Sequence, residues 1–385
     1  MDAAAIPLSL YVHIPWCVQK CPYCDFNSHQ AKSALDEERY VQQLLNDLAD
    51  QADFIQGREL TSIFFGGGTP SLFSDKSIGY FLDQARQKVS FSSNIEITLE
   101  ANPGTADAKF FSGYRASGVN RLSIGVQSLD DKKLKALGRI HSSKEAIAAI
   151  EMARKAGFEN MNLDMMHGLP DQTLDEAMDD LKGLIRLDPE HISWYQLTLE
   201  PNTLFYQKPP ELPSDDLLAD MMDHGQSLLS DKGYVQYEVS AYAKGEQAKH
   251  NVNYWQFGDY LAVGAGAHAK LTSSEGKIHR ITRLRNPKDY LASNNTLSND
   301  RVLAREELPI EFMLNACRLN QGVPANYFEQ RTGLSITDIE TQLIQAKARD
   351  LLIDSNDVIQ PTALGHRFLN DLLAIFEPDY LFGTK

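Results

Sequence analysis

The chain has 385 residues, with 37 Lys and Arg against 52 Asp and Glu, and a formal net charge of −15 at pH 7. This acidic balance argues against nucleic-acid binding through a basic surface. No apolar run approaches the roughly 20 residues of a membrane span, and the first residues lack the basic and apolar regions of a signal peptide. We therefore expect a soluble cytoplasmic protein with one large domain and a smaller one.

The first apolar run, Leu8–Ile14, leads into three of the four cysteines of the chain. Cys17, Cys21 and Cys24 follow the spacing C-x3-C-x2-C. Three thiolates this close in sequence can bind one face of an iron–sulfur cubane. The fourth thiol, Cys317, lies far along the chain, and we expect it in a hydrophobic core. One iron of the cubane would then be left open for another ligand.

Three other interpretations of the cysteines stay open. A zinc site is the first, because His13 and His29 are near enough to complete a set of ligands. A disulfide is the second, although the chain has few cysteines for its length. Three unconnected buried thiols are the third.

Beyond this loop, short β-rich runs alternate with longer segments of helical period. Strands are predicted at residues 62–65, 95–99, 121–125, 161–165 and 191–197. Helices are predicted at residues 36–50, 75–89, 106–117, 143–156, 173–187 and 215–231. With the first run, this makes six β/α units, which favours an α/β fold built as a partial (β/α)6 barrel with a parallel sheet. An open doubly wound sheet is the structural alternative.

The predicted strands end in residues that can bind a ligand. Active sites in parallel barrels lie at the carboxyl ends of the strands. The residues in question are Gly66, Gly67, Gly68 and Thr69 after the second strand, Glu100 after the third, Gln127 after the fourth and Asp164 in the fifth. Each residue alone can serve in a turn or a cap, but together they predict a binding site at one rim of the barrel.

The pattern changes after residue 231. A strand is predicted at 234–242, and a segment rich in aromatic residues, His250-Asn251-Val252-Asn253-Tyr254-Trp255, follows it. A run rich in Gly and Ala at 260–268 would let the chain pass close beneath a flat ligand. The charged residues between 275 and 289 are all basic, as in a solvated face or a site for carboxylates: Lys277, Arg280, Arg283, Arg285 and Lys288.

The remainder, from about residue 305, is predicted to be mainly helical, with a short hairpin at 353–359 and a closing helix at 362–376. We therefore predict three parts. Residues 1–240 form the barrel, residues 241–300 form a β and loop extension, and residues 301–385 form a winged-helix-like C-terminal domain.

Residues 11–15, Tyr-Val-His-Ile-Pro, followed by the three cysteines and Tyr23, resemble the opening of the radical S-adenosylmethionine (SAM) enzymes. The resemblance is specific to the branch around oxygen-independent coproporphyrinogen III oxidase, and it extends over essentially the whole chain. It implies a [4Fe-4S] cluster on Cys17, Cys21 and Cys24, with SAM bound through its amino and carboxylate groups to the open iron.

The resemblance also implies roles for other residues. Gly67, Gly68 and Thr69 match the segment that meets the amino group of SAM. Glu100 and Arg139 match the acidic and basic residues at the polar ends of SAM, and Gln127 and Asp164 match those near its ribose. Tyr11 and Tyr23 match aromatic residues packed beside the cluster.

Two functions follow from this resemblance, and three features separate them. The oxidase cleaves SAM to a radical that starts the decarboxylation of porphyrinogen propionates, and its signature continues to a fourth cysteine, where this chain has Phe26. The oxidase also carries a longer leader before its first strand. The haem-binding branch carries the motif H-N-x-x-Y-W, which matches residues 250–255.

The sequence therefore predicts a haem chaperone of the radical SAM family, with the oxidase as the alternative. His250 is the predicted haem ligand, because neutral imidazole is a common ligand of haem iron. The expected partners are haem, haem-acceptor proteins and an electron donor, without nucleic acid or an integral membrane segment. No coproporphyrinogen III oxidase activity is expected.

Overall fold

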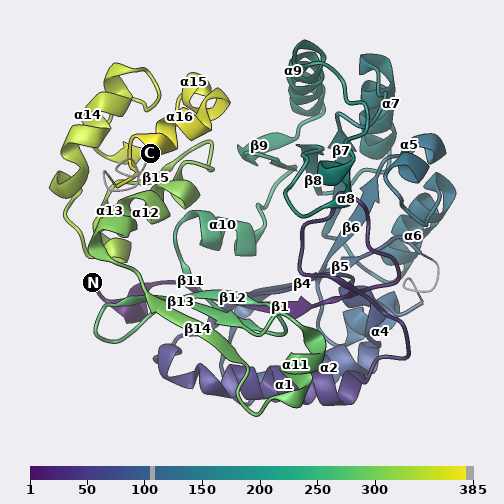
Figure 1. The fold of residues 1–385 in the computed structure, drawn as a ribbon, viewed down its shortest axis with the longest axis horizontal. Coiled ribbons are helices and arrows are strands. Elements are labelled where there is room, and N and C mark those ends of the chain that lie inside the picture. Colours follow the sequence, from purple (N-terminus) through teal and green to yellow (C-terminus); the bar gives the residue numbers. More distant parts are fainter. Residues whose placement is uncertain (105–108, 379–385) are drawn as a thin grey trace.

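A computed structural model of the chain describes residues 1–104 and 109–378, and its centre is a sheet of parallel strands (Figure 1). Six of these strands lie side by side in chain order: β1 (Leu8–Ile14), β4 (Leu60–Gly67), β5 (Phe91–Ala101), β6 (Arg121–Gln127), β7 (Met161–His167) and β8 (His191–Gln196). Each neighbouring pair is parallel. The predicted parallel sheet of six β/α units is confirmed.

Helices that follow these strands cover the outer face of the sheet. They are α1 (Glu37–Asp50), α2 (Asp75–Arg86), α4 (Phe111–Ala116), α5 (Asp131–Ala136), α6 (Ser143–Lys155), α7 (Leu174–Ile185) and α9 (Asp215–Asp231). The short helix α8 (Leu204–Gln207) lies instead beside the loop that carries the cysteines, where Phe205 packs against Tyr23. The buried side of α1 carries Tyr40, Leu44 and Leu48 at a spacing of four, as an amphipathic helix on a sheet requires. The sequence did not predict α5 and α8. The first residues of the helix predicted at 106–117 lie outside the described residues.

The sheet continues beyond the barrel strands at both edges. At the β1 edge, β11 (Asp259–Val263) pairs in parallel with β1, and three antiparallel strands follow it: β12 (His268–Thr272), β13 (Ile278–Arg283) and β14 (Leu297–Val302). At the β8 edge lie β10 (Ala241–Ala243) and β9 (Val235–Glu238). The single strand predicted at 234–242 is therefore wrong, because the chain reverses after Glu238 to form a hairpin.

Residues 249–255, expected in the β and loop extension, form a helix, α10 (Lys249–Trp255), and α11 (Pro287–Ala292) packs near α1. In Figure 1, α10 lies between the barrel and the C-terminal helices. Short 3-10 helices occur at Ala3–Ala5, Ala52–Phe54, Pro70–Leu72, Arg305–Glu307 and Ile336–Ile339. None of the helices in the described ranges combines the length and apolarity needed to cross a membrane.

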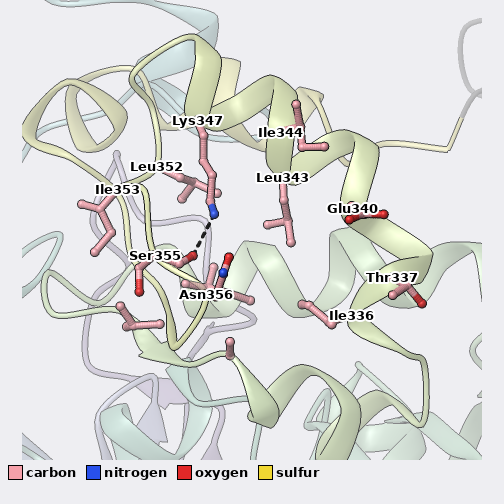
Figure 2. Close-up of a pocket in the computed structure, with 13 residues that line it drawn as sticks. Ile336, Thr337, Glu340, Leu343, Ile344, Lys347, Leu352, Ile353, Ser355 and Asn356 are labelled. Carbon is pink, nitrogen blue, oxygen red and sulfur yellow. Dashed lines mark hydrogen bonds between the residues drawn. The ribbon is translucent and has the colours of Figure 1, made fainter.

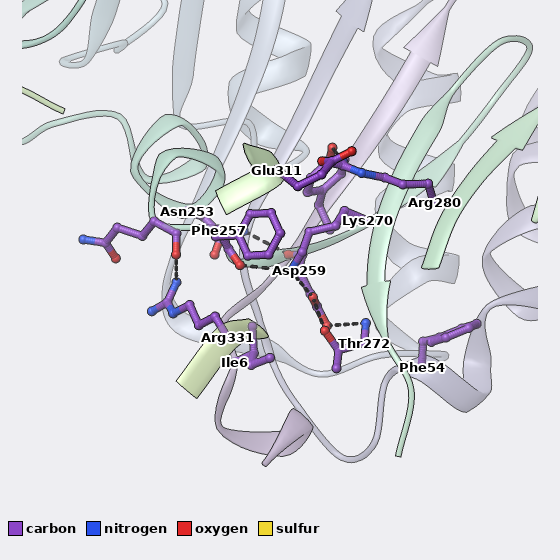
Figure 3. A network of polar contacts seen from close by, with 12 residues as sticks. Ile6, Phe54, Asn253, Phe257, Asp259, Lys270, Thr272, Arg280, Glu311 and Arg331 are labelled. Atoms are coloured by element: carbon purple, nitrogen blue, oxygen red, sulfur yellow. Dashed lines mark hydrogen bonds and ion pairs between the residues drawn. The ribbon is translucent and has the colours of Figure 1, made fainter. Parts of the chain in front are cut away.

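A buried ion network anchors the extension to the barrel (Figure 3). Asp259 begins β11, and its carboxylate accepts bonds of 2.9 Å from Arg58, Lys270 and both the amide and hydroxyl of Thr272. Burial alone would raise the pKa of Asp259, but the Lys270 ammonium and the Arg58 guanidinium hold it below its usual value. The network therefore fixes where β11 starts beside β1.

The C-terminal helices surround a second hydrophobic core that also takes in Phe257 and Ile278. The helices are α12 (Leu308–Ala316), α13 (Asn326–Thr332), α14 (Glu340–Ala348), α15 (Ala363–Arg367) and α16 (Leu369–Ala374). The predicted closing helix is thus two helices, because the chain bends at Phe368. The hairpin predicted at 353–359 is closed by an antiparallel bridge between Leu352 and Pro361, and β16 (Val358–Ile359) within it pairs with the distant β15 (Val323–Pro324). Cys317 is fully buried in this core, and burial raises its pKa to about 12.

We predict that Asp259→Asn lowers the free energy of unfolding by about 3–5 kcal/mol, because it leaves two buried cations without their counter-charge. Urea unfolding followed by circular dichroism measures this change. The control is Asp179→Asn, which removes an exposed ion pair with Lys182 and should change the stability by less than about 1 kcal/mol. Equal effects of the two substitutions would contradict an anchoring role for the network.

Candidate functional site

The three predicted cluster ligands lie on a loop that starts where β1 ends. The loop is closed at its base because β2 (Trp16–Cys17) pairs with β3 (His29–Gln30). Within it, the Cys24 amide donates a bond of 3.2 Å to the Cys21 carbonyl. All three thiols are free; Cys17 is buried, and Cys21 and Cys24 are half-buried.

The surroundings of the sulfur atoms are polar on one side. Arg139 Nη1 donates to Cys21 Sγ at 3.8 Å, and Ser28 Oγ lies 3.8 Å from Cys24 Sγ. Burial raises the pKa of the Cys17 and Cys24 thiols, so they stay neutral until a metal displaces their protons. No group of three His, Cys, Asp or Glu side chains in residues 1–104 and 109–378 converges as a single metal ion requires. A cubane binds each thiolate through a different iron, so its ligands need no common centre.

The glycines at the end of β4 are required by the packing of the chain itself. Gly67 has φ +114°, and a Cβ there would lie 2.5 Å from the His13 ring. A Cβ on Gly68 would lie 2.5 Å from the Trp16 carbonyl oxygen, and the Thr69 amide donates to that same oxygen at 2.8 Å. The close approach of β4 to the start of the cysteine loop therefore explains these glycines even without a ligand.

Two carboxyl groups face each other inside the barrel. Glu100 accepts a bond of 3.1 Å from the Gly67 amide, and Asp164 accepts one of 2.7 Å from the Asn162 side chain. Burial, reinforced by the neighbouring Asp164, raises the pKa of Glu100 to about 8, and burial also raises the pKa of Asp164. Within the described residues, neither carboxyl forms an ion pair with a lysine or arginine. A cationic ligand group would stabilise both in the ionised form.

Arg139 and Gln127 are held by polar neighbours on adjacent strand ends. Arg139 Nη2 donates to Asn102 Oδ1 at 2.8 Å and to the Gly125 carbonyl at 2.9 Å. Gln127 has φ +67°, which is uncommon for a residue other than glycine, and its Oε1 accepts a bond of 2.9 Å from the Tyr195 hydroxyl. Backbone strain of this kind gathers at functional sites.

Sequence reasoning did not assign Asn102 or Tyr195 to the site. Asn102 also donates a bond of 2.9 Å to Thr69 Oγ1, so it joins the β4 end to Arg139 and thereby to Cys21. Alternate residues of a strand share a face, and Asn102 lies two positions after Glu100. Tyr195 lies two positions after Ser193 in β8, and the structure shows that the Ser193 side chain hydrogen-bonds Asp164.

Of the two predicted aromatic residues, Tyr23 lies within the cysteine loop and Tyr11 lies on β1. The Tyr23 ring packs 6.3 Å from Phe205, and burial raises its pKa although Arg139 opposes the shift. The Tyr11 hydroxyl donates to His13 Nδ1 at 2.8 Å, while His13 Nε2 donates to the Asn27 carbonyl at 2.9 Å. A carbonyl oxygen can only accept, so this pair of bonds fixes the tautomer of His13.

His250, on α10, is buried inside the barrel rather than on a loop. Its Nδ1 lies 2.6 Å from Glu96 Oε1, and its ring lies 4.4 Å from the Phe64 ring. Burial lowers the pKa of His250, although Glu96 opposes this shift. Burial by itself would raise the pKa of Glu96, but the His250 contact keeps it below its usual value. A neutral imidazole therefore donates from Nδ1 to an ionised carboxylate.

A cavity of about 470 Å³ opens between the cysteine loop, α10, β11, β12 and the C-terminal helix α12. Its aromatic walls are Tyr11, Phe26, Tyr254, Trp255 and Tyr260. Tyr254 and Trp255 come from the motif that contains His250, yet His250 itself does not line the cavity.

A smaller cavity of about 210 Å³ lies among the C-terminal helices (Figure 2). Its walls include Ile336, Leu343 and Ile344, and Lys347 Nζ donates to the Ser355 carbonyl at 2.8 Å. It holds no cysteine or histidine, so it offers none of the groups that a metal or porphyrin site needs.

Comparisons with known proteins agree with this geometry. The sequence-family model of the radical SAM superfamily matches residues 11–183, and the sequence-family model of the HemN C-terminal domain matches residues 303–368. The chain is 52% identical to the heme chaperone HemW of Haemophilus influenzae over 375 residues, which cover 96% of this chain and 98% of that one. It is 50% identical to heme chaperone HemW of Escherichia coli over 371 residues, with the same coverage of both chains.

A solved structure shares the fold. Coproporphyrinogen III oxidase (HemN) from Escherichia coli, a radical SAM enzyme, matches with a TM-score of 0.81 and 24% identity over 98% of this chain and 92% of that one. The parallel barrel and the three-cysteine loop thus define a radical SAM protein. Within that superfamily, the chain belongs to the family of the proteins named heme chaperone HemW.

We predict that Glu100→Gln removes a pH-dependent loss of stability. A carboxyl group whose folded pKa exceeds its unfolded pKa destabilises the fold as pH rises from about 4.5 to about 8. Between pH 5 and 8, the wild-type protein without SAM should lose up to about 4 kcal/mol relative to the variant. Thermal unfolding at pH 5, 6.5 and 8 measures this difference. A constant difference between the two proteins at all three pH values would refute the raised pKa.

Proposed function

We propose that this protein is a haem chaperone that binds a [4Fe-4S] cluster, SAM and haem, and passes haem to an acceptor protein. The observation that carries this proposal is the similarity to HemW proteins over nearly the whole chain, at 52% and 50% identity. Phe26 supports it, because it occupies the position of the fourth cysteine in the oxidase signature.

The cluster would be held by Cys17, Cys21 and Cys24, which share one short loop and are free. Arg139 supports this assignment, because a guanidinium beside Cys21 offsets the negative charge of a bound thiolate. When bound, a cubane with one open iron supplies an electron and a place for the amino and carboxylate groups of SAM.

The SAM site would occupy the carboxyl ends of the strands. Glu100 and Asp164 favour the cationic groups of SAM, because no protein cation forms an ion pair with either of them in the described part of the chain. Arg139 offers its positive charge to the carboxylate of SAM, and Gln127 offers an amide near the predicted ribose position. Gly67, Gly68 and Thr69 would border the amino group, with Tyr11 and Tyr23 as aromatic neighbours.

For haem, the predicted ligand remains His250. Its bond from Nδ1 to Glu96 resembles the arrangement of metal-binding histidines, whose second nitrogen donates to a carboxylate. Iron would then have to bind Nε2. The 470 Å³ cavity beside α10 supports haem binding in this region, because ligand pockets of this size are typically apolar with a few polar groups.

The alternative is coproporphyrinogen III oxidase activity, which the fold shared with HemN favours. A likeness at 24% identity concerns the fold alone, and Phe26 in place of a cysteine argues against the activity. The acceptor protein and the electron donor would be further partners, and the expected compartment is the cytoplasm.

We predict that anaerobic reconstitution gives about one [4Fe-4S] cluster per chain, and that Cys17→Ala, Cys21→Ala and Cys24→Ala each abolish it. Iron and sulfide analysis measures the content. Cys317→Ala is the matched control and should keep its cluster, because Cys317 is fully buried in the C-terminal core. A loss of the cluster in this control would mean that no iron is left open for SAM.

We also predict that the protein binds haem near one per chain and does not convert coproporphyrinogen III. Haem titration followed at the Soret band gives the stoichiometry. Anaerobic incubation with SAM, reductant and coproporphyrinogen III tests the oxidase. Formation of protoporphyrinogen IX in step with methionine and 5′-deoxyadenosine would show that the protein is an oxidase and contradict the chaperone assignment.

A further inference from the structure

The 470 Å³ cavity has aromatic walls that suit a flat aromatic ligand. Tyr254 and Tyr260 lie 4.7 Å apart between ring centroids, and they share the lining of the cavity with Trp255 and Phe26. Phe26 is 61% exposed, so a large apolar ring faces this space without cover. A planar ligand stacked here would remove these rings from water.

Two histidines line the cavity, and they differ in what their nitrogens do. Both nitrogens of His13 are used, because Nδ1 accepts from the Tyr11 hydroxyl and Nε2 donates to the Asn27 carbonyl. His268, at the start of β12, is exposed and has no hydrogen-bond partner in the described residues. His268 is therefore the imidazole in this cavity that can bind a metal without breaking an existing bond.

A cation completes the cavity. Arg285 lines it and is exposed, and its guanidinium forms no ion pair in residues 1–104 and 109–378. By contrast, Arg280 is paired with Glu311, and Arg283 is buried beside Asp47. Arg285 is therefore the arginine of the predicted basic run that lines the cavity without an ion-pair partner in the described residues. Arginine binds carboxylates through paired, charge-assisted hydrogen bonds.

We infer that this cavity is the haem seat, with His268 as an axial ligand of the iron and Arg285 as the partner of a propionate. This inference rests on the proposed function, and it moves the iron ligand from His250 to the histidine that faces the aromatic walls. Iron, a planar aromatic ring and carboxylates are the three features that this lining matches, and haem combines them.

His250 then acts as a positioning residue. Its bond to Glu96 fixes α10 against the strands of the barrel, and α10 carries Tyr254 and Trp255 to the cavity wall. Because the Glu96 carboxylate also accepts the Lys249 amide at 3.0 Å, the start of this helix is held at two points. The motif at residues 250–255 therefore forms part of the cavity wall, while the iron ligand, His268, comes from β12.

The test uses the full-length, tag-free protein with its cluster, titrated with ferric haem and followed by Soret absorbance and electron paramagnetic resonance. His268→Ala should lose the spectroscopic signature of histidine ligation and weaken haem binding about tenfold or more. It should still bind iron-free protoporphyrin IX, which is measured by the quenching of tryptophan fluorescence. His250→Ala should keep the histidine signature with reduced affinity. His224→Ala, an exposed histidine on α9, is the matched control and should bind as the wild type does.

The outcomes separate the inference from the function beneath it. If His250→Ala loses histidine ligation and His268→Ala keeps it, the cavity assignment is wrong and the chaperone stands. If the wild-type protein binds no haem, the proposed function itself fails. Displacement of protoporphyrin IX by SAM in the Cys17→Ala protein would assign the cavity to SAM and overturn the inference.

Arg285 provides an independent arm. Arg285→Gln should weaken haem binding about tenfold or more, because one charge-assisted contact is lost. The same substitution should leave the affinity for haem dimethyl ester unchanged, since the ester carries no carboxylate. An equal loss for both ligands would mean that Arg285 shapes the cavity without meeting a propionate.

Discussion

The arrangement of the barrel strands depends on the tight packing of other backbone segments against residues 13–16. On one side, a Cβ at Gly67 or Gly68 would meet this segment at 2.5 Å, and on the other a Cβ at Gly264 would lie 2.3 Å from the His13 carbonyl oxygen. The Tyr40 hydroxyl donates to that oxygen at 2.8 Å and accepts from the Ala265 amide at 2.9 Å. β1, β4 and β11 are thereby fixed to one another at their carboxyl ends, and the cysteine loop leaves the sheet from a rigid base.

Two acidic side chains of β5 point into the barrel interior but have different partners there. Glu96 is compensated by His250 and by two backbone amides, so it stays ionised. Glu100, four residues on and on the same face of the strand, has the Gly67 amide and a second acid, Asp164, as neighbours. A protein that needed only stability would have compensated both. Neither Glu100 nor Asp164 forms an ion pair in the described residues, so under the proposed function a cationic group of the ligand would supply the counter-charge.

The sequence predicted what depends on local pattern: the alternation of strands and helices, the cysteine spacing and the polar strand ends. It failed where contacts join distant segments. The sequence around His250 gives no sign of its contact with Glu96, which lies 154 positions away. Likewise, the pairing of β11 with β1 brings Phe26 and His268 to the same cavity although they are far apart in the chain. The basic run illustrates the limit, because only the fold shows which of its arginines is buried, paired or free.

Asn27, three residues after the last cluster cysteine, has a consequence for regulation. Its side-chain amide donates bonds of 2.9 Å to the carbonyls of Ala265 and Arg285, so it joins the cysteine loop to the segment that contributes Gly266 and Arg285 to the cavity wall. Coupling between two sites is reciprocal, so under the proposed function any order that a bound cluster gives the loop would also raise the affinity of the cavity for its ligand. Under the proposed function, such a carrier would bind haem more weakly before its cluster is assembled, and haem transfer would then depend on the supply of iron and sulfide.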